Sequence, residues 1–202
     1  MQDIIKSLRA GISIGNTLDA FDKSIKISDA PDKTETSWGN PVITQELVDA
    51  YIEAGLNVIR IPVTWTGHFG DAPDYTIEEA WLKRIKEVVD YAYKRGAYAI
   101  LNLHHENWNY PYYENEERAC IIMTALWSQL AAEFAAYDEH LIFEGQNEPR
   151  KVGTPLEWNG GDEEGWAVVN STNAAFVNTV RQGTGYNKSR YLMIPGYAAN
   201  CT

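Results

Sequence analysis

The stretch Leu141-Ile142-Phe143-Glu144-Gly145-Gln146-Asn147-Glu148-Pro149-Arg150 carries an apolar run of strand type up to a glutamate. The proline that follows lacks a backbone N–H, so we expect the strand to end there. In a parallel barrel, catalytic groups lie at the C-terminal ends of the strands. A carboxyl group at such a place can donate a proton while the neighbouring amide binds a hydroxyl group. We therefore predict that Glu148 and Asn147 form the centre of an active site.

Four other runs have a similar strand-type composition, and amphipathic stretches separate them. The five predicted strands cover residues 9–15, 57–63, 98–104, 141–147 and 191–197. The first intervening helix is expected to begin at Thr44, whose hydroxyl suits an N-cap, and to end before Gly55. The other three helices show apolar faces at helical spacing: Leu82, Ile85, Val89 and Ala92; Ile122, Leu126, Leu130 and Phe134; and Val169, Thr172, Phe176 and Val180. This alternation predicts an α/β fold with a parallel sheet.

The predicted architecture is an incomplete TIM-type (β/α)8 barrel with roughly five parallel strands and four helices. The loops after the strands, 16–40, 65–75, 105–113 and 148–162, are long and rich in polar and aromatic residues. Because the loops after the helices are short, this asymmetry favours a functional face at the strand C-termini. Five strands leave the first and the fifth as open edges, so we expect an isolated monomer to aggregate or oligomerise.

Composition limits the classes of function. A chain of 202 residues with 45% hydrophobic content suits one well-packed domain. The formal net charge of −11 and the lack of any Lys/Arg cluster argue against nucleic acid or an anionic membrane as a partner. No apolar run reaches membrane-spanning length, and the first six residues lack the apolar region of a signal peptide. The seven Trp and twelve Tyr suit either stacking on sugar rings or packing in core and loops.

Neither the cysteines nor the paired histidines predict a metal site. Cys120 and Cys201 form no CxxC pattern, so neither a disulfide framework nor a zinc site is indicated. The sequence His104-His105-Glu106 contains ligand types, but adjacent residues of a strand point to opposite faces of the sheet. We therefore expect no metal and no other cofactor.

Four segments carry a family resemblance: Gly15-Asn16-Thr17-Leu18-Asp19-Ala20, Glu35-Thr36-Ser37-Trp38-Gly39-Asn40-Pro41, Leu103-His104-His105-Glu106-Asn107-Trp108, and residues 143–150. In this order and spacing, the chain resembles the family 5 glycoside hydrolases, the cellulase A family of retaining enzymes. Within that family it is similar to an endoglucanase and xyloglucanase subgroup. The resemblance covers the whole chain, and it implies that residues 1–202 are a partial catalytic domain holding barrel strands one to five.

The resemblance also implies roles for individual residues. Glu148 would be the general acid/base, and Asn147 would bind the 2-hydroxyl group of the sugar at the cleaved bond. Arg60 and His104 would orient the nucleophilic carboxylate and tune its charge. The residues implied to bind substrate are Asn16, Trp38, Trp65, His105 and Trp108. An alternative is that Arg60 only neutralises Glu144, which lies deeper in the same strand as Glu148 and is interpreted as structural.

A second catalytic carboxyl group is not predicted in this chain. A retaining site needs two carboxyl groups about 5–5.5 Å apart, one that donates a proton and one that attacks. In the family, the seventh strand supplies the attacking glutamate, and no strand of that kind follows residue 197. The remaining candidates, Glu106, Glu157, Glu163 and Glu164, lack a strand-end setting opposite Glu148. The nucleophile is therefore expected outside this sequence.

The function implied by the resemblance is endo-acting hydrolysis of β-1,4-glucan, namely cellulose, mixed-linkage glucan or xyloglucan, by a retaining double displacement. The parent enzyme would be secreted and extracellular, although this chain shows no signal peptide. We interpret the chain as part of such an enzyme. Two alternatives remain: a half-barrel that pairs with a copy of itself or with a complementary C-terminal barrel half, and a non-catalytic glucan-binding module.

Overall fold

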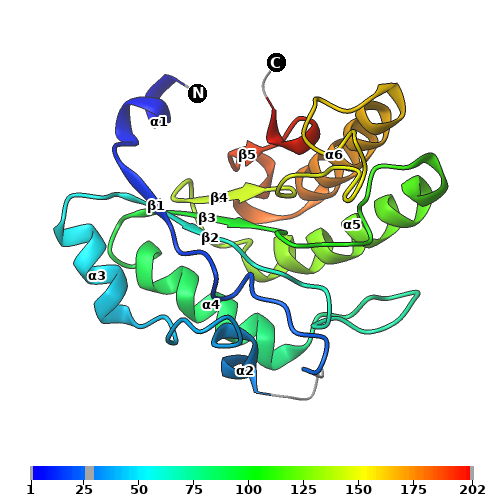
Figure 1. The fold of residues 1–202 in the computed structure, drawn as a ribbon. Helices are drawn as coiled ribbons and strands as arrows, with labels where there is room; N and C mark the ends of the chain where they lie inside the picture. The colour runs from blue at the N-terminus through cyan, green and yellow to red at the C-terminus, as the bar shows by residue number, and fades with distance from the viewer. Residues whose placement is uncertain (1, 26–29, 201–202) are drawn as a thin grey trace.

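The computed structural model describes residues 2–25 and 30–200, and Cys201 therefore lies outside the described residues. One sheet of five parallel strands, in the order β1-β2-β3-β4-β5, forms its centre (Figure 1). The strands are β1 (Gly11–Ser13), β2 (Val58–Ile61), β3 (Tyr98–Asn102), β4 (Leu141–Glu144) and β5 (Leu192–Met193). All five predicted strands are present, in sequential order and parallel, as in an incomplete barrel.

Four long helices connect consecutive strands, as predicted. They are α3 (Gln45–Glu53), α4 (Glu79–Tyr93), α5 (Tyr113–Glu133) and α6 (Glu163–Gln182). Thr44 caps α3, because its hydroxyl accepts a hydrogen bond from the backbone N–H of Leu47. Shorter elements complete the fold: α1 (Gln2–Ser7), α2 (Pro31–Glu35), and the 3-10 helices η1 (Gly185–Lys188) and η2 (Tyr197–Ala199). In the described part of the chain, no helix is both long and apolar enough to cross a membrane.

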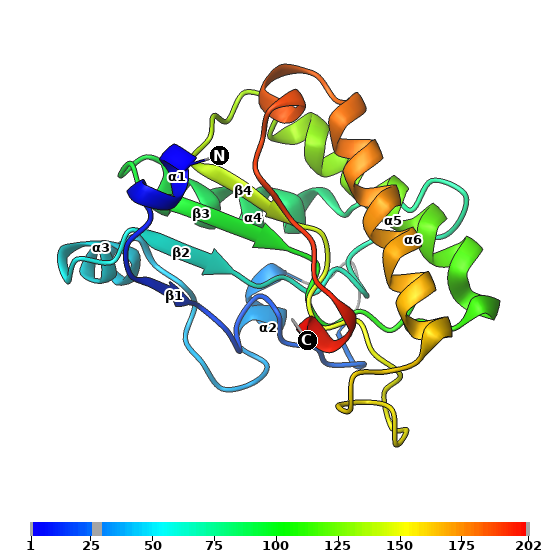
Figure 2. The ribbon, with the colours of Figure 1, turned by 90° about the horizontal axis from the view of Figure 1, so that it is seen from above.

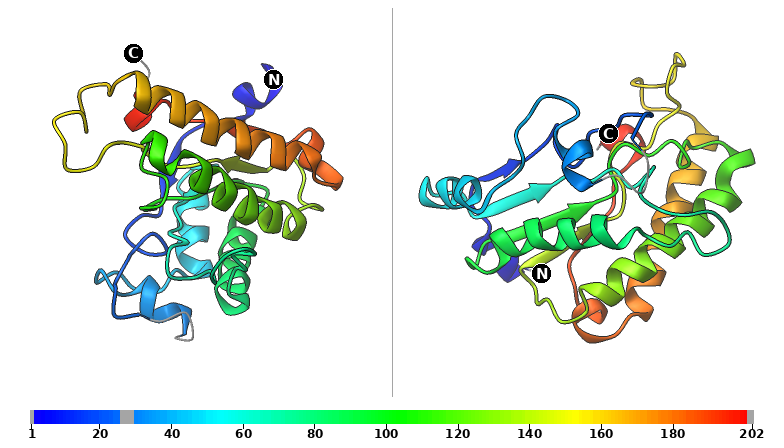
Figure 3. Two further views of the ribbon diagram at one scale, coloured as in Figure 1. Left: turned by 90° about the vertical axis from the view of Figure 1, so that its right-hand side faces the viewer. Right: turned by 90° about the horizontal axis from the view of Figure 1, so that it is seen from below.

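The connecting helices cover one face of the sheet and leave the other largely open. Helices α5 and α6 run side by side along β4, and α4 packs beneath β2 and β3 (Figure 3). Seen from the opposite side, β1 to β4 are uncovered except where α1 crosses their N-terminal ends (Figure 2). This is the arrangement of a barrel wall, with helices outside and the open face inside.

Strand alternation divides the side chains between these two faces. Ile59, Ile61, Leu101 and Phe143 point toward the helices and belong to the main hydrophobic core. On the inner face, a smaller apolar cluster of Ile4, Tyr98, Ile100 and Ile142 lies toward the N-terminal ends of the strands, and α1 supplies Ile4. Further along the same strands the inner face becomes polar, with Arg60, Asn102 and Glu144. The polar end of the inner face is where the strand C-termini meet.

The observed strands are shorter than predicted because the regular ladder stops before the extended backbone does. The backbone N–H of His104 still donates to Val63 O at 2.7 Å, and that of Asn147 to Leu103 O at 2.7 Å. These two hydrogen bonds continue the parallel pairing beyond β2, β3 and β4. They keep the residues that follow neighbouring strands side by side.

A buried ion pair ties the long loop after β1 to α4. Glu35 is fully buried, and its carboxylate receives two hydrogen bonds from Arg84, at 2.9 and 3.0 Å. The same carboxylate accepts from the backbone N–H of Ile43, while Arg84 donates to Ile43 O at 2.6 Å. The pair thereby holds the segment that precedes Trp38 against α4.

We expect Arg84→Met to lower the free energy of unfolding by about 3–5 kcal/mol, because it leaves the buried Glu35 carboxylate without its counter-ion. Urea unfolding of the complete protein that carries this sequence measures the change. The matched control is Lys94→Met, whose ion pair with Asp90 at 3.1 Å is exposed and is expected to be worth about 0–1 kcal/mol. Equal losses in the two variants would contradict the importance of the buried pair.

Candidate active site

The chain segment that leads from β4 into Glu148 is anchored to α6. At Gly145, a Cβ atom would lie 2.6 Å from the ring of Phe176, so only glycine permits this close approach of strand and helix. The next side chain, Gln146, is fully buried. It donates to Thr172 and Asn173 of α6 at 2.8 and 3.1 Å, and accepts from Asn109 at 3.1 Å. The backbone that presents Asn147 and Glu148 is therefore held from both sides.

The ion pair between Arg60 and Glu144 orients the side chain of Asn147. Arg60 donates to both oxygens of Glu144, at 2.7 Å through Nε and 2.6 Å through Nη2, in the bidentate geometry that suits a guanidinium. The same Nη2 donates to Asn147 Oδ1 at 2.9 Å. This fixes the amide with its oxygen toward Arg60 and its donor nitrogen turned away from the guanidinium. Arg60 thus neutralises Glu144, as the alternative interpretation held, and also orients the predicted hydroxyl-binding amide.

The carboxyl group of Glu148 lies at the rim of a cleft, with its side chain 39% exposed. Arg150 donates to the backbone carbonyl of Glu148 at 3.0 Å and lies 3.5 Å from its Oε2. Arg150 is itself held by Glu157 at 3.1 Å and by the ring of Trp158, whose centroid lies 4.1 Å from the guanidinium carbon. A cation is thereby fixed beside the carboxyl group.

The loop after Glu148 is fastened to the start of α6. Lys151 is buried, and its ammonium group contacts Asp162 at 2.7 Å and Glu164 at 2.5 Å. Its backbone N–H donates to the hydroxyl of Tyr197 at 2.8 Å. These contacts of Lys151 hold the loop 148–162 against the N-terminus of α6 and against Tyr197.

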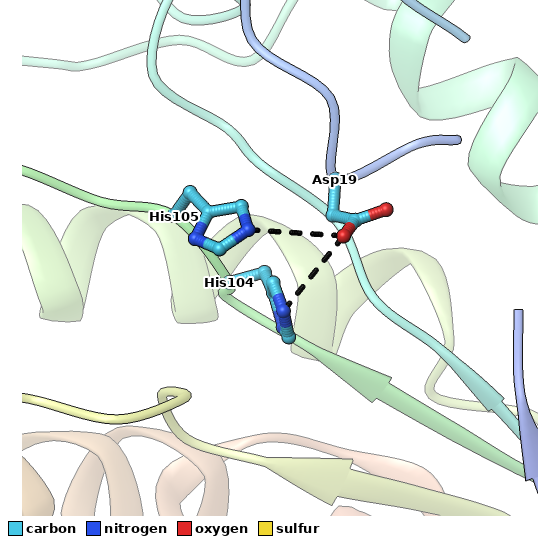
Figure 4. Close-up of side chains that lie close together, drawn as sticks. All are labelled: Asp19, His104 and His105. Carbon is cyan, nitrogen blue, oxygen red and sulfur yellow. Dashed lines mark ion pairs between the residues drawn. The ribbon is translucent and has the colours of Figure 1, made fainter. Parts of the chain in front are cut away.

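Two imidazoles that line the same cleft as Glu148 lie close to the carboxylate of Asp19. The Nε2 atoms of His104 and His105 each lie 3.8 Å from Asp19 Oδ2, and the two rings are T-shaped with centroids 4.5 Å apart (Figure 4). The expectation that adjacent histidines point to opposite faces is wrong, because β3 ends at Asn102 and the pleat does not continue through them. One ligand atom from each of the three residues lies within 4.8 Å of the others, which is the spacing of a potential metal site.

The surroundings of both histidines disfavour a positive charge on the ring. Burial lowers the pKa of His104 to about 3, and the positive charges of His105, Arg60 and Arg150 act in the same direction. Burial also lowers the pKa of His105, although the charge of Asp19 opposes this shift. A neutral imidazole can donate one hydrogen bond and accept one.

The cleft has a volume of about 370 Å³ and opens to solvent. It brings together four of the residues predicted from the sequence, namely Trp38, His104, His105 and Glu148. Trp38 is 45% exposed, its indole N–H donates to Phe21 O at 3.1 Å, and its ring lies 5.6 Å from that of His105. It therefore offers an aromatic face to a ligand, as an apolar sugar face requires.

Three of the predicted substrate-binding residues do not line this cleft. Trp65 and Trp108 are 0% and 3% exposed and belong to the hydrophobic core, which contradicts the expectation that they contact substrate. Their indole N–H groups are used internally, by Asn102 O at 3.0 Å and by the Glu106 carboxylate at 2.7 Å. Asn16 is exposed with a positive φ of 59°, and it is absent from the cleft lining.

The buried carboxylate of Glu106 accepts hydrogen bonds from the backbone at Trp65 and from the indole of Trp108. Its carboxylate accepts from the backbone N–H groups of Trp65 and Thr66, from the Thr66 hydroxyl and from the Trp108 indole. Burial raises the pKa of Glu106, and these hydrogen bonds oppose the shift. Because every one of these donors belongs to the scaffold, the hydrogen bonds of the Glu106 carboxylate hold the loops after β2 and β3 together.

Three further residues of the site carried no predicted role. Asp19 comes from the loop after β1, and no periodic pattern places it beside the histidines. Arg150 directly follows the proline that ends the strand. Asn102 is the last residue of β3, and strand alternation from Tyr98 and Ile100 puts its side chain on the inner face. Of the three, only Asn102 left a recognisable signal in the sequence.

A parallel barrel sheet with a carboxyl group, an oriented amide and two imidazoles at its strand C-termini defines a barrel enzyme. The family model described as Cellulase (glycosyl hydrolase family 5) matches residues 18–202, and the chain belongs to this family. Endoglucanase B of Neocallimastix patriciarum is 55% identical over 199 residues, which are 98% of this chain and 42% of that protein.

Two solved structures have the same fold at close similarity. One is a GH5-4 broad specificity endoglucanase from Ruminococcus champanellensis with bound cellotriose, at 46% identity and a TM-score of 0.95. The other is XEG5A, a GH5 xyloglucan-specific endo-beta-1,4-glucanase from a metagenomic library in complex with cellotriose, at 46% identity and a TM-score of 0.94. The alignments cover 98% and 100% of this chain and 58% of each neighbour. The chain thus spans about half the length of its relatives.

Buried histidines give the fold a pH dependence that can be measured. Burial lowers the pKa of His68 to about 4, and its ring stacks on Trp81 with centroids 3.9 Å apart. For His68 and His104, the unfolded chain takes up a proton near pH 6.5, whereas the folded chain does so only near 4 and 3. Their contribution to stability is therefore fully present above pH 6.5 and is lost as the pH falls toward these values.

We expect the free energy of unfolding to fall between pH 6.5 and 4, by up to about 1.4 kcal/mol per pH unit from each histidine. His68→Phe keeps an aromatic ring against Trp81 and should reduce this slope. Urea unfolding at a series of pH values measures it in both proteins. A change in packing would shift the whole curve by a constant, so an unchanged slope in the variant would contradict the assignment to His68.

Proposed function

We propose that the protein carrying this chain is an endo-acting β-1,4-glucanase, and that residues 1–202 form the acid/base half of its catalytic domain. The observation that carries the proposal is the placement of Glu148 on an anchored strand end, at the rim of an open cleft. Asn147, oriented by Arg60, lies next to it in the chain. Family membership supports glycoside hydrolysis, and the endoglucanases to which the chain is similar support a glucan substrate.

In this proposal, Glu148 protonates the leaving-group oxygen of the cleaved bond and later deprotonates the attacking water, as a retaining double displacement requires. Asn147 donates from Nδ2 to the 2-hydroxyl group of the sugar, because its oxygen is engaged by Arg60. His104 and His105 face the bound chain, and Trp38 stacks on a sugar ring further along the cleft. Cellulose, mixed-linkage glucan and xyloglucan all present the equatorial hydroxyl groups and apolar ring faces that such a cleft can bind.

The attacking carboxylate is proposed to come from outside these 202 residues. Among the described residues nearest the site, Glu144 is paired with Arg60, Glu106 is used by the scaffold, and Asp19 accepts from the backbone N–H of Thr17 at 2.9 Å. None of the three is left to attack a sugar carbon opposite Glu148. Further strands beside β5, where Met193 and Ile194 are 44% and 57% exposed, would both close the barrel and supply the missing group.

A polymeric substrate also supports action outside the cell, because a polysaccharide cannot enter by diffusion. We therefore propose that the parent protein is secreted.

We expect Glu148→Gln to lower kcat by about 10²–10⁴-fold. The glutamine amide has the size and shape of the carboxyl group, but it cannot transfer a proton to the leaving group or take one from water. Reducing-sugar release from soluble β-1,4-glucan by the complete protein measures this. Glu163→Gln, an equal change at an exposed position in the first turn of α6, should keep full activity. A Glu148→Gln protein as active as the Glu163→Gln control would rule out the acid/base assignment.

Trp38→Ala should raise KM by about 5–10-fold with a smaller effect on kcat, since an aromatic contact worth about 1 kcal/mol binds ground state and transition state alike. Trp166→Ala is the matched control, because Trp166 is similarly exposed at 49% but lies outside the cleft lining. Kinetics on a soluble glucan separate the two parameters. An unchanged KM in Trp38→Ala, or an equal rise in the control, would argue against a sugar platform at Trp38.

A further inference from the structure

The side-chain amide of Asn102 is fully buried and contacts a backbone N–H, a carboxylate and an imidazole. Its oxygen accepts from the backbone N–H of Val63 at 3.1 Å. Its nitrogen lies 3.2 Å from Glu144 Oε1 and 3.0 Å from His104 Nδ1. Asn102 is the residue that joins the Arg60–Glu144 pair to the histidines of the cleft.

The orientation of this amide follows from its other two partners. A backbone N–H can only donate, so the atom facing Val63 must be the oxygen. The atom facing Glu144 must then be the nitrogen, which suits a carboxylate that already receives two hydrogen bonds from Arg60. Turning the amide over would set donor against donor and acceptor against acceptor, so Val63 and Glu144 together exclude it.

The orientation of Asn102 decides which nitrogen of His104 carries hydrogen. An amide nitrogen has only hydrogens to offer, so Nδ1 of His104 must present its lone pair. The single hydrogen of the neutral ring then lies on Nε2. We infer that Asn102 is a positioning residue that holds His104 in the Nε2–H tautomer, so that His104 serves the cleft as a hydrogen-bond donor.

The surroundings of His104 Nε2 leave its N–H group able to donate a hydrogen bond to a ligand. Its closest carboxylate oxygen, Asp19 Oδ2, is 3.8 Å away, beyond hydrogen-bond reach. His104 lines the cleft. A hydroxyl group entering between these residues would accept from Nε2–H and donate to Asp19. This benefit to catalysis rests on the proposed glucanase function, whereas the tautomer itself does not.

The side-chain amide of Asn102 also affects whether Asp19, His104 and His105 can bind a metal ion. A metal would need the lone pair of His104 Nε2, and the hydrogen would have to move to Nδ1. Histidines that bind metals almost always donate that second N–H to a carboxylate, a carbonyl or a water. Asn102 offers a donor where an acceptor is required, so it opposes metal binding by a group of otherwise suitable ligands.

The direct test is the position of the hydrogen in the wild-type protein. Nitrogen-15 NMR of the complete protein, labelled at histidine, distinguishes protonated from bare ring nitrogens, and His104→Gln assigns the signals. We expect Nε2 of His104 to be protonated and Nδ1 to be bare throughout pH 5–8. A protonated Nδ1, or a mixture of both tautomers, would overturn the inference.

The second test converts the donor into an acceptor. Asn102→Asp would accept from Nδ1–H of His104 and free Nε2, so the variant should bind Zn²⁺ at least about 10-fold more tightly than the wild type. Adding Asp19→Asn should abolish the gain. Asn173→Asp is the matched control, because it makes the same change at another buried asparagine, one that contacts Gln146 and Pro195. Its zinc affinity should stay at the wild-type value.

Titration calorimetry with Zn²⁺ measures these affinities. An unchanged affinity in a folded Asn102→Asp protein would overturn the inference, and if that variant does not fold, the wild-type tautomer decides alone. Neither readout requires glucan hydrolysis. A protein that proves inactive on glucan would therefore refute the proposed function without touching the assignment of Asn102.

Discussion

The bidentate contact between Arg60 and Glu144 is the interaction on which the site depends. It places a guanidinium and a carboxylate on the inner face of the sheet, where an isolated charge would be costly. Each partner then reaches one residue further: Arg60 to the amide of Asn147, and Glu144 to the amide of Asn102. One ion pair thereby orients the side-chain amides of two asparagines, one at the end of β3 and one after β4.

The inner face of the sheet is apolar toward the N-terminal ends of the strands and polar toward their C-terminal ends. Toward the N-terminal ends of the strands, Ile100 and Ile142 of the inner face pack with α1, and the helix-facing residues form the main core. Toward the C-terminal ends, polar residues occupy the same face. Because successive inward positions along a strand lie about 6.5–7 Å apart, one pleat is enough to pass from apolar packing to the charged layer. The loops can then vary at the polar end while the packing beneath them stays the same.

Sequence periodicity was sufficient for the fold and for part of the site. The strand near Ile59 and Ile61 could be predicted because both faces of a barrel strand are recognisable, one from apolar residues and one from an inward polar residue. Pro149 directed attention to Glu148, although β4 itself ends at Glu144 and only the hydrogen bond from Asn147 N–H to Leu103 O continues its pairing. The loops carry no such period, so Asp19 could not be brought to the histidines from sequence.

Aromatic residues in loops were the main source of error, since composition cannot tell a packed indole from an exposed one. Trp65 and Trp38 look alike in sequence, yet one is buried and the other forms part of the cleft. The indole of Trp65 donates to the backbone oxygen of Asn102, thirty-seven residues away in the chain. The histidine pair departs from strand alternation for a related reason, because β3 ends at Asn102, whose amide contacts Val63 and Glu144 of neighbouring segments.

The attachment of the 148–162 loop to α6 has a consequence for the recognition of a flexible polymer. Lys151 and Arg150 hold this loop through ion pairs within the chain itself, so its conformational entropy is lost during folding. Under the proposed function, only the polysaccharide would have to become ordered on binding. The cleft would then act as a rigid template, and selectivity among glucans would follow from how stiff each chain already is in solution.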